Sequence, residues 1–154
     1  MALKMDRQED AYELGYFLNE VADRGNIVSI STAGSGVAMD SPSNLATVAA
    51  AASGAKPLGF LMNDFVNTDA TKIQRNWFKD EHRPGDKCTI LTKGWVVTDR
   101  ITGTPTAGQL AALGPSGTVT GVAIGTPGSA AQPLVGRFRS GKDEAGFAKV
   151  LVDL

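Results

Sequence analysis

The chain of 154 residues has the length of one domain, and its formal net charge of -1 lacks the basic excess that is typical of nucleic-acid-binding proteins. Its 18 glycines and 7 prolines, with only 6% aromatic and 20% charged residues, indicate many turns and short strands rather than a helical bundle. A single cysteine excludes an internal disulfide framework, and no apolar run approaches the roughly 20 residues that span a bilayer. The N-terminus has no apolar segment of the kind found in secretory signals, so we expect a soluble protein made in the cytoplasm.

The first predicted element is an amphipathic helix over residues 6–23. Asp6 and Glu9 have the spacing of a capping box, and acidic residues in a first turn suit the helix dipole. Gly25 is expected to end the helix. An apolar stripe follows helical spacing through Ala11, Leu14, Phe17, Leu18 and Val21. A lone helix of this length is marginal, so the stripe must pack on the protein's own sheet or on a neighbouring subunit.

The middle of the chain predicts strands separated by turns. Residues 26–32 alternate between apolar and polar side chains, and residues 58–62 form an apolar strand. Residues 45–52 fit a helix by their alanine content and a strand by their short length. Residues 67–84 are polar and charged, so we expect an exposed excursion. The Trp77-Phe78 pair within it either folds back onto the core or docks on a partner.

Residues 84–99 are predicted to form a β-hairpin. Its arms would be residues 87–91 and 95–99, joined at residues 92–94, with Gly94 supplying the positive φ that such turns need. Trp95 is expected to be a core anchor, because a buried indole removes much apolar surface from water. Cys88 is expected to be a small buried apolar residue.

The last third of the chain predicts three more strands, over residues 117–124, 134–139 and 147–154. In the last strand one face is wholly apolar and should face the core, namely Ala148, Val150, Val152 and Leu154. The predicted fold class is therefore mainly β: a small barrel-like or sandwich β body with one N-terminal amphipathic α-helix. We expect an N-terminal helix or arm over residues 1–25 and a single β domain over residues 26–154.

No motif in the chain supports catalysis. Residues 136–143 nearly match a phosphate-binding loop, but Asp143 stands where a hydroxyl is needed and a strand, not a helix, is predicted to follow. His82 is the only histidine and has adjacent carboxylates but no separated partners for a metal site. A dyad of His82 with Cys88 would need an exposed thiolate, which a strand position does not favour. We predict no catalytic residues, no metal and no cofactor.

Several glycine-rich stretches and strand edges occur in one order along the chain. They are GYFLNE and ADRG within 15–25, VSISTAGSGVA at 28–38, GAKPLG at 54–59, KGWVVT at 93–98, and VGRF through KD to GFAKV within 135–150. In this order, over about residues 13–154, the chain resembles the head decoration, or capsid cement, proteins of tailed bacteriophages, especially short-tailed ones.

The resemblance implies a mostly β, barrel-like body without a catalytic role. Such proteins bind the outer surface of an assembled capsid, bridge neighbouring major capsid subunits and help the shell resist internal pressure. The implied partners are the major capsid protein and further copies of the same chain, as dimers or trimers, with no nucleic acid and no membrane. The implied location is the outer capsid surface of the virion, after synthesis in the host cytoplasm.

Two groups of residues are candidate interfaces, because apolar anchors ringed by charge suit a binding hot spot. One is the helix stripe Leu14, Phe17, Leu18 and Val21, and the other is the excursion with Arg75, Trp77, Phe78 and Lys79. The competing function is a carbohydrate-binding or adhesive β module displayed on the particle. Its sugar platform would be an exposed Trp77 or Tyr12.

Overall fold

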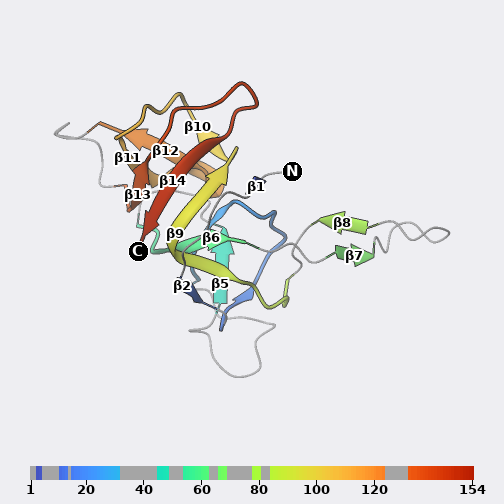
Figure 1. The fold of residues 1–154 in the computed structure, drawn as a ribbon. Helices are drawn as coiled ribbons and strands as arrows, with labels where there is room; N and C mark the ends of the chain where they lie inside the picture. Colours follow the sequence, from blue (N-terminus) through green and yellow to red (C-terminus); the bar gives the residue numbers. More distant parts are fainter. Residues whose placement is uncertain are drawn as a thin grey trace.

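The computed structural model describes residues 3–4, 11–13, 15–31, 45–48, 54–62, 66–68, 78–80, 84–123 and 132–154 (Figure 1). The first strands are β1 (Leu3–Lys4), β2 (Ala11–Glu13), β3 (Phe17–Leu18), β4 (Ile27–Ile30), β5 (Leu45–Val48), β6 (Pro57–Leu61), β7 (Val66–Thr68) and β8 (Phe78–Asp80). The later elements are β9 (Ile90–Thr98), β10 (Ile101–Thr102), β11 (Leu110–Leu113), the 3₁₀ turn η2 (Pro115–Gly117), β12 (Val119–Val122), β13 (Leu134–Phe138) and β14 (Ala148–Asp153).

The described strands form one large sheet and one small ribbon, which confirms the mainly β class. The large sheet has the order β10-β12-β11-β13-β14-β9-β6-β4-β5-β3, with β1 and β2 also pairing with β9. The order has two ends, so over the described residues the sheet is open and does not close into the expected barrel. β7 and β8 pair with each other as a separate ribbon that projects from the body (Figure 1).

The predicted hairpin over residues 84–99 is wrong, because residues 90–98 form the single long strand β9. The register with β14 continues without a shift through the expected turn: Lys93 pairs with Asp153, Gly94 with Val152 and Trp95 with Leu151. Gly94 does have a positive φ, of 140°, but it uses this conformation within an extended strand. A glycine in a strand interior often marks a bend, and Figure 1 shows β9 curving along its length.

Strand β9 connects two hydrophobic clusters. Its first residues pair with β6 and β2, and its later residues pair with β14 and β1. Leu91 lies in a larger cluster with residues of β11, β12, β13 and β14, while the adjacent Ile90 lies in a smaller cluster with Leu18, Ala22 and Val28. Because neighbouring residues of a strand point to opposite faces, the two clusters pack on opposite faces of β4, β6 and β9.

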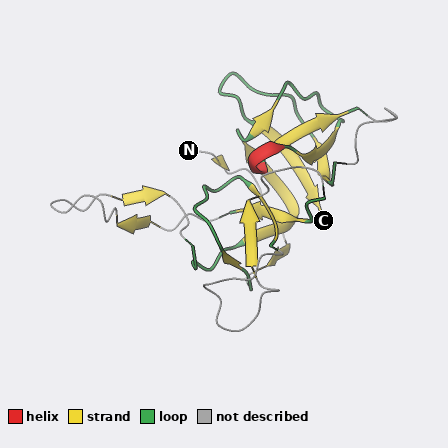
Figure 2. Ribbon diagram, turned by 180° about the vertical axis from the view of Figure 1, so that it is seen from behind, coloured by secondary structure: helices red, strands yellow, loops and turns green. Residues whose placement is uncertain are grey.

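The predicted N-terminal helix is also wrong. Ala11–Glu13 form β2 on β9, and Phe17–Leu18 form β3, which pairs in parallel with β5. Within the described part of the chain the only helical element is η2, drawn red in Figure 2. Pairing with an existing sheet satisfies backbone groups and buries Leu18 completely, whereas an isolated helix of this length gains little.

The terminal strand confirms the predicted core face. Ala148, Val150 and Val152 of β14 are buried, while Leu154, beyond the end of the strand, is 44% exposed. The expectation that Trp95 is a core anchor is wrong: its side chain is only half-buried, in register with the half-buried Leu151 rather than with the core residues.

One open question from the sequence is settled by strand pairing. Residues 45–48 form a strand, because β5 completes hydrogen bonding to both β4 and β3. The start and end of the expected excursion form the β7–β8 ribbon, in which Thr68 pairs with Phe78 and Asn67 with Lys79. Residues 69–77, and with them Arg75 and Trp77, lie outside the described residues.

Replacing Gly136 with alanine should destabilise the protein. Gly136 in β13 has a φ of 154°, and a Cβ added there would lie 1.8 Å from the backbone oxygen of Leu151 in β14. The two strands must separate to admit it, so we expect a loss of about 2 kcal/mol or more in the free energy of unfolding. Chemical denaturation measures this loss.

Gly15→Ala is the matched control, because a Cβ at Gly15 would meet no atom within 4 Å. Its effect should stay within about 0.5 kcal/mol, as is usual for exposed positions. Equal stability of Gly136→Ala and Gly15→Ala would show that β13 and β14 do not pack as closely as described.

Candidate binding surface

The described members of the sequence-predicted interface groups lie in separate parts of the structure. Phe17 and Val21 are 37% and 55% exposed, whereas Leu18 between them is fully buried. Phe78 and Lys79 lie in β8 of the small ribbon, and Leu14, Arg75 and Trp77 are outside the described residues. Of the N-terminal group, therefore, only Phe17 and Val21 are shown to face solvent.

A second surface, which the sequence analysis did not single out, is the outward face of β11, β13, β14 and β9. Leu110 pairs with Arg137, Arg137 with Leu151, and Leu151 with Trp95. Residues directly opposite one another on adjacent strands share a face, so these four side chains form one row across the sheet. We call this the outer sheet face, and it consists of Leu110, Leu134, Arg137, Arg139, Leu151, Asp153, Trp95, Lys93 and Lys149.

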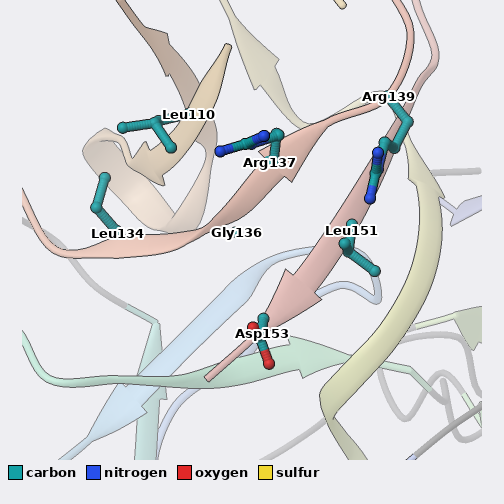
Figure 3. A pocket seen from close by; sticks show the side chains of 7 residues that line it. All are labelled: Leu110, Leu134, Gly136, Arg137, Arg139, Leu151 and Asp153. Atoms are coloured by element: carbon teal, nitrogen blue, oxygen red, sulfur yellow. The ribbon is translucent and has the colours of Figure 1, made fainter. Parts of the chain in front are cut away.

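The outer sheet face contains a shallow hollow of about 310 Å³. Figure 3 shows the residues that line it on β11, β13 and β14: Leu110, Leu134, Gly136, Arg137, Arg139, Leu151 and Asp153. Leu134, at the edge of the hollow, is 51% exposed. The hollow thus combines apolar side chains with two guanidinium groups.

Two cations lie against the ring of Trp95. The guanidinium of Arg139 and the ammonium of Lys149 are each 5.1 Å from the ring centroid. A cation at this distance is attracted by the negative face of the indole, and the aliphatic stems of both side chains cover apolar surface. This packing explains why Trp95 is half-buried although it faces away from the core.

The outer sheet face is strongly positive. It carries four cationic side chains, Arg137, Arg139, Lys149 and Lys93, and only one carboxylate, Asp153. The chain as a whole, in contrast, has a formal net charge of -1. The carboxylate oxygen Oδ1 of Asp153 lies 3.3 Å from Nζ of Lys93, and both side chains are about two-thirds exposed. Within the described residues neither Arg137 nor Arg139 forms an ion pair. The charges of these two arginines are therefore not balanced by an ion pair within the described residues.

Part of this surface could be predicted from the sequence. The alternation of residues 147–154 predicts that Lys149, Leu151 and Asp153 share the face opposite the core, and the structure confirms it. The sequence does not reveal that Arg137 and Trp95 join them, because strand order and register across non-adjacent segments are not visible in local periodicity.

The described residues provide no evident chemical centre. They contain no group of three or more His, Cys, Asp or Glu side chains that could hold a metal ion. No helix among them is long and apolar enough to cross a membrane. Residues 136–138, at the start of the near-match to a phosphate loop, belong to β13, and the Asp143 carboxylate accepts hydrogen bonds from the backbone amides of Ala145 and Phe147. That carboxylate therefore closes a turn.

Cys88 is buried, as predicted, and its thiol donates a hydrogen bond of 3.3 Å to the backbone oxygen of Tyr16. Burial disfavours the thiolate and raises the pKa of Cys88 from 9.0 to about 11, against a smaller lowering by a backbone hydrogen bond. A nucleophilic cysteine needs a partly exposed environment that lowers the pKa of its thiol. Cys88 therefore acts as a buried packing residue.

Comparison with known proteins gives one family. The model of the family described as "Structural cement protein (E217 gp24/Pam3 gp6)", a phage cement family, matches residues 14–152. The matched range includes nearly all of the described strands and all the residues of the outer sheet face except Asp153. No curated protein matches the chain.

Cys88 should react slowly in the folded protein and make stability depend on alkaline pH. Its pKa is raised on folding from 9.0 to about 11, so its contribution to stability is complete below pH 9 and is lost as the pH rises toward 11. At pH 9 we expect alkylation at least about tenfold slower in the native than in the denatured protein.

Cys88→Ala is the reference, because it removes the thiol and leaves all other titrating groups. The free energy of unfolding of the wild type relative to Cys88→Ala should stay constant below pH 9 and fall above it. Rapid native-state alkylation, or a difference independent of pH, would show that Cys88 is accessible rather than buried.

Proposed function

The chain belongs to the phage structural cement protein family, and on this premise we propose that it binds the outer surface of an assembled capsid and stabilises the shell by bridging major capsid protein subunits. The family match over residues 14–152 is the observation that carries this proposal. The role proposed is structural and needs no catalytic centre, and it places the protein on the virion after synthesis in the host cytoplasm.

The proposed role requires only modest affinity for each copy. Many identical sites on one lattice are occupied together, and any ligand that binds only the assembled shell stabilises it by mass action. Assembly of the chain into dimers or trimers would add multivalency, since each further contact becomes effectively intramolecular. We therefore include self-association in the proposal.

Phe17 and Val21 remain candidates for contact with the shell, because both are exposed on the part of the chain that precedes β4. Leu18 is better assigned to the core, where it packs with Ala22 and Val28. The excursion with Arg75 and Trp77 is the second candidate, on the sequence argument of an aromatic anchor between charges.

Purified protein should co-sediment with undecorated capsids and raise their melting temperature. Binding should saturate, because the number of lattice sites is fixed, and capsids that already carry the protein should take up little more. Sedimentation followed by gel densitometry measures occupancy, and calorimetry measures the melting temperature. Absence of co-sedimentation at high protein concentration, with an unchanged capsid melting temperature, would disprove the proposed function.

Trp77→Ala should lower capsid occupancy several-fold, as expected for an aromatic anchor at an interface. Trp77→Phe is the matched control, because it keeps an aromatic ring and should retain most of the binding. Thermal unfolding of each free variant separates a docking role from a core role. If Trp77→Ala changes neither occupancy nor thermal stability, Trp77 is not part of the interface.

A further inference from the structure

The outer sheet face has the composition of an interface. Leu110, Leu134 and Leu151 supply apolar contact around the hollow, and Trp95 lies at the end of the same row. Aromatic residues and arginine are enriched at protein interfaces and at their energetic hot spots. β11, β13 and β14 also carry core residues on their other face, so the outer sheet face stands on a rigid support.

The charge of the face selects the chemistry of its partner. Arg137 and Arg139 line the hollow, Lys149 lies beside Trp95, and the one carboxylate, Asp153, already lies 3.3 Å from Lys93. Guanidinium groups bind carboxylates with two parallel hydrogen bonds, which gives direction as well as affinity. A partner surface with several carboxylates around an apolar side chain complements this arrangement.

We propose that the outer sheet face is the surface with which the protein docks on the capsid shell, against an acidic patch whose central apolar side chain enters the hollow between Leu110, Leu134 and Leu151. This inference rests on the proposed function and adds to it the face that binds and the chemistry of the shell site. The arginines pair with carboxylates of the patch.

A second copy of the chain fits this face poorly. A two-fold dimer through the outer sheet face would place the same patch on both partners, so two surfaces that each carry Arg137, Arg139 and Lys149 would face one another. Like charges facing one another oppose association. Nucleic acid supplies negative charge but no apolar side chain for the leucine-lined hollow, so an acidic protein surface is the better match.

The test compares charge reversals on the full chain. Arg137→Glu/Arg139→Glu reverses the face, while Arg137→Glu and Lys56→Glu change the net charge by the same amount, the first on the face and the second at an exposed lysine outside it. Binding to undecorated capsids is measured by co-sedimentation over a range of salt concentrations. Arg137→Glu alone leaves the contacts of Trp95 intact and serves as the second variant if the double reversal does not fold.

The wild type should bind more weakly as salt rises, because salt screens exposed charges beyond about 8 Å at physiological ionic strength. Arg137→Glu/Arg139→Glu should weaken binding by about tenfold or more and lose most of the salt dependence, and Arg137→Glu should weaken it in part, while Lys56→Glu should bind as the wild type does. Leu134→Ser should weaken binding at low and high salt alike, because it removes an apolar contact.

The outcomes separate this inference from the proposed function. If the wild type binds capsids and Arg137→Glu/Arg139→Glu binds equally well, the outer sheet face is not the docking surface although the function stands. If the reversal instead changes the oligomeric state of the free protein, or abolishes binding to duplex DNA while capsid binding persists, the face serves a second copy or nucleic acid and the inference is overturned. If the wild type does not bind capsids, the proposed function itself fails.

Discussion

The continuity of β9 through Gly94 is the constraint on which the rest of the structure depends. Its early residues pair with β6 and β2, and its later residues pair with β14 and β1. The strand therefore contributes side chains to both hydrophobic clusters. Leu91 contributes to one cluster and Ile90 to the other. Burying each such side chain stabilises the fold by about 1.5–3 kcal/mol. A real turn at Gly94 would interrupt the register with β14 and separate β14 from the part of β9 that pairs with β6.

The same strand orders the outward face. Because the register of β9 with β14 is continuous, Trp95 lies opposite Leu151, and the pairing of β14 with β13 then brings Arg137 into the same row. Arg139 follows the end of β13 and reaches the ring of Trp95 from there. The core and the proposed docking surface are therefore two faces of one set of strands, and neither can shift without the other.

The sequence pattern predicted β4, β6, β12, β13 and β14, and it is clearest in β14, because a strand with one buried face shows its period directly in the sequence. It could not reveal long-range partners. Residues 92–94 have turn composition, yet pairing with β14 keeps them extended. Residues 11–18 carry apolar side chains at spacings that also suit a helix, yet β2 and β3 gain partners in β9 and β5 that a helix would forgo.

The candidate site was less predictable than the fold, for the same reason. Sequence spacing could place Lys149, Leu151 and Asp153 together, since they belong to one strand, but not Arg137 or Trp95. Family membership, in contrast, was visible in the order of short glycine-rich stretches, and the match over residues 14–152 confirms it. Among those glycines, Gly59, Gly94 and Gly136 lie within strands, and a Cβ at Gly136 would meet the backbone of β14, so these three report the fold rather than the binding face.

An electron cryomicroscopy map of capsids decorated with this protein tests the central claim most directly, because it shows both where the chain sits and which face it turns to the shell. The account predicts density on the outer surface of the capsid, between major capsid subunits, with β11, β13 and β14 against the shell and the guanidinium groups of Arg137 and Arg139 facing carboxylates. Density in which those strands face solvent, or an undecorated outer surface, would contradict it.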